Sequence, residues 1–294
     1  MDRKSIIITT VSILLFTSFS FSQDDLPQID VTRLHTHLYK IAIGSVNAVA
    51  SVGPDGVLLS DTGFEETAEV VKAELKKLGS DDIKIVINTH WHSDHVGGNM
   101  FFGKKATIIA HRNVRKLLSE DQRLPYWQET YKALPEHARP RVTFSQGLTI
   151  FFNSEEIEIT HFPGGHTDGD AIVYFKNANV VHLADLLFSD GFPAVDFENG
   201  GNVAQFASNL KQIAGMLPSD VRIIAGHGDD YTIQQLETYA DMLLSTLEIV
   251  RNEMRNGTSL EEMKKSKILR DWETWGKTHF SCDRWIDIVF HSLK

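Results

Sequence analysis

Hydrophobic and polar positions alternate in short runs over residues 34–61, and the turn sequences "GSVN" and "GPDG" separate the runs. Alternation with a period of two residues indicates half-buried strands, and Gly, Pro, Asp and Asn at the breaks indicate tight turns. We therefore expect three strands here. The next segment, "EETAEVVKAELKKLG", has helical spacing, acidic residues in its first turn, lysines in its last turn and Gly79 beyond its end. This pattern predicts a helix, and "IKIVINT" after it predicts a buried strand.

The same order returns in the second part of the chain. Strands are predicted near "ATIIA", "LTIFF", "EIEITHF", "AIVYF" and "VVHLA", followed by the helix "VAQFASNLKQIAGML" and the strand "VRIIAG". Blocks rich in strands, each closed by a helix, favour sheets packed together with helices outside them. The sequence thus predicts an α/β sandwich of two similar halves.

Two segments lie outside this alternation. Residues 119–145 are rich in proline and aromatic side chains, and we interpret them either as an insertion that covers a site or as a purely structural excursion. The C-terminal segment, about 256–294, follows a long amphipathic helix predicted from Thr232 to Arg255. It is expected to be helical, with Ser259 and Glu262 forming a capping box. Its tryptophans are expected to pack in the core.

The N-terminus and the composition set the class of protein. The chain has 294 residues, 42% hydrophobic and 23% charged, which is typical of one folded domain. "MDRK", a following apolar stretch and the small residues of "SFSQDD" predict a signal peptide at residues 1–22, so that residues 23–294 form the mature domain. The apolar stretch is shorter than the roughly 20 residues of a spanning helix. We therefore expect an exported protein, periplasmic or secreted, without a stable membrane anchor.

The charge of the chain limits the classes of molecule that it can bind. Removal of residues 1–22 leaves 27 basic against 38 acidic residues. Phosphate binding depends on clustered Lys and Arg, so this balance argues against a nucleic-acid partner and favours a small-molecule substrate. Cys282 is the only cysteine, which excludes an internal disulfide.

The candidate chemistry begins at "INTHWHSDHVGGN", where His90, His92, Asp94 and His95 follow a predicted strand within six residues. Imidazole nitrogens and carboxylate oxygens are zinc ligands, and a loop after a strand can turn such closely spaced side chains toward one ion. We expect Gly97 and Gly98 to let the backbone pass close to the metals.

Three further candidate ligands follow predicted strands or lie between them. His166 lies in "FPGGHTDGD", Asp185 ends the strand in "NVVHLAD", and His227 follows "VRIIAG" in "GHGDD". Loops at strand ends converge on sites, so these residues and the first group together supply seven ligands, enough for two ions.

The four motifs "THWHSDH", "GGHTDGD", "HLADLLF" and "AGHGDD" resemble those of the metallo-β-lactamase-fold hydrolases, over roughly residues 34–245. The resemblance implies a four-layer αβ/βα sandwich with a dinuclear site at one edge. It implies that one metal is bound by His90, His92 and His166 and the other by Asp94, His95 and His227, with Asp185 bridging. Zinc is expected, with iron or manganese as alternatives, and Asp61 and Thr89 would hold the histidine rings.

The expected activity is opening of a carboxylic ester, lactone or lactam bond by a hydroxide that Asp94 also orients. An iron-dependent persulfide dioxygenase and a metal-dependent phosphodiesterase are the alternatives, and a non-catalytic metal-binding protein is a third. The zinc β-lactamases have a lysine that binds the substrate carboxylate, and in this chain the corresponding residue is Phe188. We expect substrate contacts from Asn47, Trp91 and Phe188, and a mostly apolar rim that also includes Ser45, Tyr126, Trp127 and Phe192.

Overall fold

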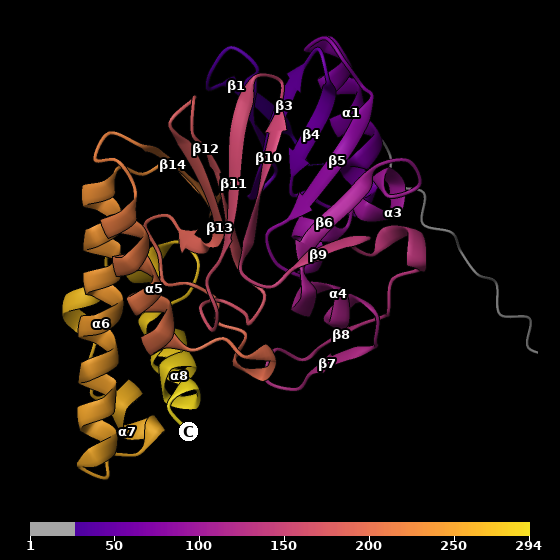
Figure 1. Ribbon diagram of the computed structural model, residues 1–294. Coiled ribbons are helices and arrows are strands. Elements are labelled where there is room, and N and C mark those ends of the chain that lie inside the picture. Colours follow the sequence, from indigo (N-terminus) through magenta and orange to yellow (C-terminus); the bar gives the residue numbers. More distant parts are fainter. Residues whose placement is uncertain (1–26) are drawn as a thin grey trace, which may run out of the picture.

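The computed structural model describes residues 27–294 (Figure 1). The predicted signal peptide, residues 1–22, lies outside the described residues. Within residues 27–294, no helix has both the length and the apolar character needed to cross a bilayer.

The first sheet has seven strands in the order β1-β2-β3-β4-β5-β6-β9. Strands β1 to β4 pair antiparallel, and β4, β5, β6 and β9 pair parallel. The three strands predicted within residues 34–61 are confirmed as β2, β3 and β4, whereas β1 and β9 were not predicted. The bounds are β1 Ile29–Arg33, β2 Leu38–Ile43, β3 Val46–Gly53, β4 Gly56–Ser60, β5 Ile83–Asn88, β6 Thr107–His111 and β9 Val142–Phe144.

The second sheet has five strands in the order β10-β11-β12-β13-β14, of which only the last pair is parallel. All five were predicted. Their bounds are β10 Gly147–Phe152, β11 Glu155–His161, β12 Ala171–Phe175, β13 Val180–Phe188 and β14 Arg222–His227. Residues 119–145 contain a separate two-stranded hairpin, β7 (Gln122–Leu124) with β8 (Glu129–Tyr131).

Helices cover the outer faces of both sheets, as Figure 1 shows with α1 and α3 on one side and α5, α6 and α8 on the other. The capping box of Ser259 and Glu262 is confirmed at the start of α7. The α-helices are α1 Ala68–Lys77, α2 Ser93–Val96, α3 Asn99–Phe102, α4 Arg112–Leu118, α5 Val203–Met216, α6 Ile233–Arg255, α7 Leu260–Lys265 and α8 Cys282–Ser292.

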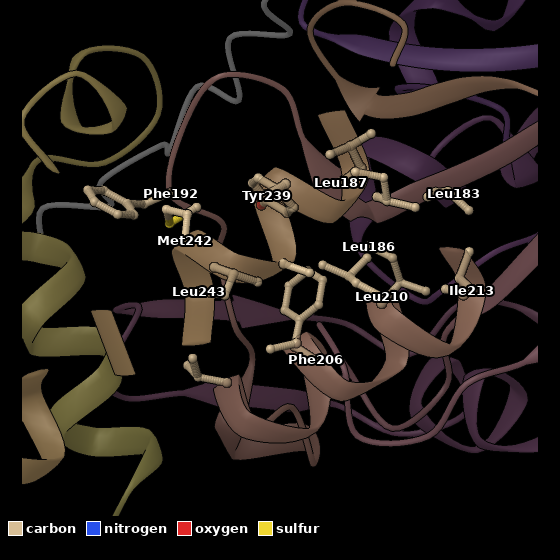
Figure 2. Close-up of a cluster of buried hydrophobic side chains, with 14 of the residues drawn as sticks. Leu183, Leu186, Leu187, Phe192, Phe206, Leu210, Ile213, Tyr239, Met242 and Leu243 are labelled. Carbon is tan, nitrogen blue, oxygen red and sulfur yellow. The ribbon is translucent and has the colours of Figure 1, made fainter. Parts of the chain in front are cut away.

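Three apolar layers hold the sandwich together. Val49 and Leu58 of the first sheet meet Ile157 and Val173 of the second in a buried cluster between the sheets. A second cluster joins the first sheet to α1. The largest joins β13 to α5, α6 and α8, and Figure 2 shows part of it, with side chains of β13, α5 and α6 pointing toward one another. The predicted four-layer αβ/βα sandwich is therefore confirmed, and Trp285 is fully buried in it as expected.

Candidate metal centre

Both sheets contribute to one cluster of histidines and carboxylates. Strand β5 ends at Asn88, and the turn after it and α2 carry His90, His92, Asp94 and His95. The loop before β12, strand β13 and the end of β14 carry the rest of the predicted set, which is His166, Asp185 and His227. The structure brings all seven residues together.

The seven residues form two groups. One ligand atom from each of His90, His92, His166 and Asp185 lies within 4.8 Å of the others, and the same holds for Asp94, His95 and His227. This division is the one that the resemblance implied.

The carboxylate of Asp185 lies between the groups. Its Oδ2 is 3.7 Å from His90 Nε2 and 3.4 Å from His166 Nε2. Its Oδ1 is 2.9 Å from His95 Nε2 and 3.4 Å from His227 Nε2. Each oxygen therefore faces a different group, which is the arrangement that a bridging ligand requires.

Asp94, the carboxylate of the second group, is more exposed than the bridging Asp185. Its Oδ2 is 3.6 Å from His95 Nε2 and 3.5 Å from His227 Nε2. Its side chain is 28% exposed, against 4% for Asp185. Asp94 thus faces both the cluster and the solvent.

Each of the five histidines is held through its other ring nitrogen. His95 Nδ1 donates to Asp61 Oδ2 (2.9 Å), and Thr89 Oγ1 donates to the same oxygen (2.7 Å). Because the Thr89 hydroxyl has only one hydrogen, it accepts from His90 Nδ1, 3.1 Å away. The ring-holding positions predicted for Asp61 and Thr89 are confirmed.

The other three rings are held by groups that the sequence did not indicate. His92 Nε2 donates to Asp196 Oδ2 (3.2 Å), which also accepts from the Trp91 indole. His166 Nδ1 donates to the Ala194 carbonyl and His227 Nδ1 to the Ser45 carbonyl, each over 2.9 Å. A ring that donates in this way turns the lone pair of its second nitrogen toward the cluster.

The nitrogen and carboxylate oxygen atoms that point into the cluster fit metal ions, because they do not form hydrogen bonds with one another. Within residues 27–294, buried His90 Nε2, His95 Nε2 and Asp185 Oδ1 have no hydrogen-bond partner. His92 Nδ1 and His166 Nε2 face each other at 2.8 Å, with both rings donating from their other nitrogen. Buried polar groups are normally paired, so orphaned lone pairs of nitrogen and carboxylate oxygen indicate cation sites. Asp61, by contrast, is satisfied by Thr89 and His95 and is not needed as a ligand.

The electrostatics agree with this assignment. Burial lowers the pKa of His90 well below its ordinary value and that of His166 to about 4, so both rings are neutral and can act as ligands. Although burial opposes ionisation of Asp185, His95 and His227 hold its pKa well below the usual range. Burial also opposes charge on His95, yet Asp185 and Asp94 raise its pKa well above the usual value. The carboxylates therefore create a field that attracts positive charge.

Two close approaches of the backbone position the cluster. A Cβ on Gly226 of β14 would lie 2.2 Å from Asp185 Oδ1. A Cβ on Gly97 or Gly98 would instead meet backbone atoms of Glu65 (2.6 Å) or Thr62 (2.7 Å). The interpretation of Gly97 and Gly98 as giving room to the metals is therefore wrong, because these glycines let α2 pack on the loop after Asp61.

A cavity of about 510 Å³ opens onto the cluster. Phe188 lines it as predicted, with its ring stacked on His227 at a centroid distance of 4.8 Å. Other predicted rim residues, Ser45 and Trp127, also line it. The remaining lining residues are Phe64, His92, Ser93, Asp94, Leu124, Glu129, Tyr131, His166, Asp185, Ala194, Asp196, His227 and Phe280.

Four predicted pocket residues, Trp91, Asn47, Phe192 and Tyr126, do not line this cavity. Trp91 is 2% exposed and lies in an apolar cluster, where its indole donates to Asp196. Asn47 is 4% exposed, and its amide donates to the backbone carbonyls of Ala225 and Gly228. Phe192 is fully buried against Trp285. The predictions of substrate contact for Trp91 and Asn47 are corrected accordingly, since both side chains hold the site from behind.

Comparison with known proteins gives the family. The chain matches the Metallo-beta-lactamase superfamily over residues 42–227 and belongs to it. An uncharacterized protein of Aquifex aeolicus is 31% identical over 64% of this chain and 92% of its own length. A hydroxyacylglutathione hydrolase of Pelagibacter ubique is 30% identical over 52% of this chain, which spans 54% of that protein.

A metallo-beta-lactamase type 2 of Bacteroides fragilis is 22% identical over 49% of this chain and 52% of its own length. Among solved structures, a metallo-beta-lactamase from Pontibacter korlensis has a TM-score of 0.61 at 18% identity. That alignment covers 74% of this chain and 99% of the other, and it shows the shared fold. The protein is thus a metallo-hydrolase of this superfamily with a dinuclear His/Asp site.

Proposed function

We propose that the protein is an exported dinuclear zinc hydrolase that opens a carboxylic ester, lactone or lactam bond in a small molecule. The observation that carries the proposal is the position of Asp185, whose two oxygens face two separate groups of histidines beneath an open cavity. Two divalent ions in these groups would supply Lewis acidity and lower the pKa of a shared water toward neutrality.

The residues of the chain have separate tasks in this reaction. His90, His92 and His166 would hold one ion, and Asp94, His95 and His227 the other. Asp94 reaches the cavity, so its carboxylate can also accept a hydrogen bond from the attacking hydroxide and fix its orientation. Phe188, stacked on His227, keeps water from that side of the reacting bond.

The cavity wall favours a substrate without an anionic group. Among the described residues that line it, none is lysine or arginine. A substrate carboxylate would lack a charge-assisted hydrogen bond that contributes about 1.5–3 kcal/mol. We therefore rank neutral esters and lactones above β-lactam drugs that carry a carboxylate.

Export and the small-molecule partner are part of the proposal. The pattern at residues 1–22 supports signal-peptide cleavage, and the acidic balance opposes nucleic acid. Mass spectrometry of protein recovered from outside the cytoplasm should give a mature chain beginning at Gln23. A full-length chain confined to the cytoplasm would contradict export.

The activity is tested with a substrate panel. The zinc-loaded protein should hydrolyse at least one of a set of lactones, aryl esters, thioesters and β-lactams. Asp94→Asn should lower kcat/KM about 100-fold or more, because the hydroxide loses its acceptor. Asp81→Asn, which removes an exposed carboxylate outside the cavity, should leave the rate unchanged. No metal-dependent turnover on the panel, or oxygen consumption by a protein that holds one iron, would overturn the proposal.

A further inference from the structure

One carboxylate in the cavity is not explained by the metal centre. Asp94 and Asp185 face the ligand groups, and Asp61 and Asp196 accept from the rings of His95 and His92. Two divalent ions held there would balance the charge of these four carboxylates. Glu129 is a further negative charge in the wall, and the described lining residues include no lysine or arginine to offset it.

The hairpin of β7 and β8 aims Glu129 at the cavity. Glu129 pairs across the hairpin with Leu124, and Tyr131 lies two residues along the same strand. Side chains of such positions share one face of a strand pair, and all three line the cavity. The Tyr131 hydroxyl contacts the Glu129 carboxylate. Burial, and then Glu129, raise the pKa of Tyr131, so the phenol keeps its proton and donates to Glu129.

Aromatic rings line the same cavity as this carboxylate. Trp127 and Phe280 line this cavity with ring centroids 5.9 Å apart, and Tyr131 packs edge-on against Trp91 at 5.3 Å. Phe188 also lines the cavity, and its ring contacts those of His227 and His279. Aromatic faces beside a carboxylate are a recognition site for ammonium groups, because the ring quadrupole and the negative charge both attract a cation.

Within residues 27–294, no lysine or arginine forms an ion pair with Glu129, and the arginine that contacts the neighbouring rings is already paired. The Arg284 guanidinium lies 4.9 Å from the centre of the Trp127 ring and 4.4 Å from that of Tyr126. It is 3.5 Å from the Asp287 carboxylate and does not line the cavity. Among the described residues, Glu129 is therefore left without a basic partner in the cavity.

We propose that Glu129, together with the rings of Trp127, Tyr131 and Phe280, selects substrates that carry an ammonium group beside the bond to be opened. The identity of that bond rests on the proposed function, whereas binding of the cation does not. The substrate class is accordingly an amine-bearing or quaternary-ammonium ester, lactone or amide.

The first test is binding by isothermal titration calorimetry to the zinc-loaded protein. Choline and 3,3-dimethylbutanol have nearly the same shape and both carry a hydroxyl, but only choline is charged. Choline should bind more tightly, so the Kd of 3,3-dimethylbutanol divided by the Kd of choline should exceed one. Glu129→Gln should lower this ratio about tenfold. Equal binding of the two compounds, or a ratio unaffected by Glu129→Gln, would overturn the inference.

A matched variant separates a local effect from the general field of the protein. Glu120→Gln removes the same charge from the same segment at a position outside the cavity. For Glu120→Gln, the ratio of the two dissociation constants should equal that of the unmodified protein. An equal loss in Glu120→Gln and Glu129→Gln would mean that the net charge of the protein, and not the wall, attracts choline.

Turnover then distinguishes this inference from the proposed function. Acetylcholine should have a lower KM than 3,3-dimethylbutyl acetate, its neutral isostere. If the neutral ester is hydrolysed without any preference for the cation, the inference fails and the hydrolase function stands. If neither ester nor any other panel substrate is hydrolysed while choline binding depends on Glu129, the proposed function fails and the inference stands.

Discussion

At the scale of single residues, the metal centre depends on its ligands and equally on the groups that accept hydrogen bonds from the ligand histidines. His92 shows this most clearly, since its Nδ1 faces His166 while its Nε2 donates to Asp196. Asp196 is 1% exposed and also accepts from Trp91 and Asn199. It therefore fixes one ring and the loop that follows β13 at the same time.

We expect Asp196→Asn to weaken zinc binding about 10- to 100-fold, because His92 loses the carboxylate that orients it and increases its basicity. Competition with a chromophoric chelator measures this affinity. Asp121→Asn, which alters an exposed ion pair with Lys132, is the control. An unchanged zinc affinity in Asp196→Asn would show that the Asn side chain positions His92 equally well.

The sequence predicted the ligands more readily than their supports. His90 to His95 are neighbours in the chain, so their spacing reveals them. Asp196 is 104 positions from His92, and nothing in its local sequence marks it. Trp91 and Asn47 were misassigned because a residue pattern places a side chain near a site without showing which way it points. Their hydrogen bonds to Asp196 and to the backbone near His227 decide that direction.

At the scale of elements, the parallel pair β13 and β14 sets the position of the bridging carboxylate. Their register shifts twice along the pair, between His182 and Ala184 and between Ala184 and Phe188. Ala184 has a φ of 45°, which is an uncommon conformation for a residue with a side chain. Gly226 lies beside this irregularity and leaves room for the Asp185 side chain.

Gly226→Ala should displace Asp185, because the added Cβ would lie 2.2 Å from its Oδ1. We expect a loss of about 1–3 kcal/mol in the free energy of unfolding, together with reduced metal content. Urea denaturation and elemental analysis measure the two effects. Gly215→Ala in α5 meets no atom within 4 Å and should be neutral or stabilising by up to about 1 kcal/mol. Full metal content in Gly226→Ala would contradict this role of the glycine.

The elements with a strong repeating pattern were predicted correctly, including α1, α5, α6 and all strands of the second sheet. The hairpin of β7 and β8 was not, because each strand has three residues and its pattern is too short to show a period. β9 is also three residues long, and it is held by pairing with β6 and by Phe144, which packs in the cluster between the sheets. Strands this short are stabilised by tertiary contacts, and the local sequence pattern does not reveal such contacts.

At the scale of the whole molecule, the two sheets also meet through a pair of histidines away from the metal centre. His111 at the end of β6 stacks on His161 at the end of β11, with ring centroids 3.7 Å apart and planes 10° apart. Burial, and then the neighbouring His161, lower the pKa of His111 to about 4. The pKa of His161 is lowered as well, chiefly by burial.

This pair should make the fold sensitive to acid. Between pH 6.5 and 4 the unfolded chain binds a proton at residue 111 that the folded chain does not, so the free energy of unfolding falls as the pH falls. His111→Asn should make this slope shallower by up to about 1.4 kcal/mol per pH unit. Urea denaturation of both chelator-treated proteins across this range measures the difference, since the ligand histidines contribute equally to both. Identical slopes would contradict the assignment.

The central claim is that this chain needs two metal ions, one in each histidine group with Asp185 between them. The most direct measurement is zinc titration of the chelator-treated protein while hydrolysis of a panel substrate and bound zinc are followed together. We expect no turnover without metal and full turnover only when two equivalents per chain are bound. Full turnover with one equivalent, or turnover that survives complete removal of metal, would contradict it.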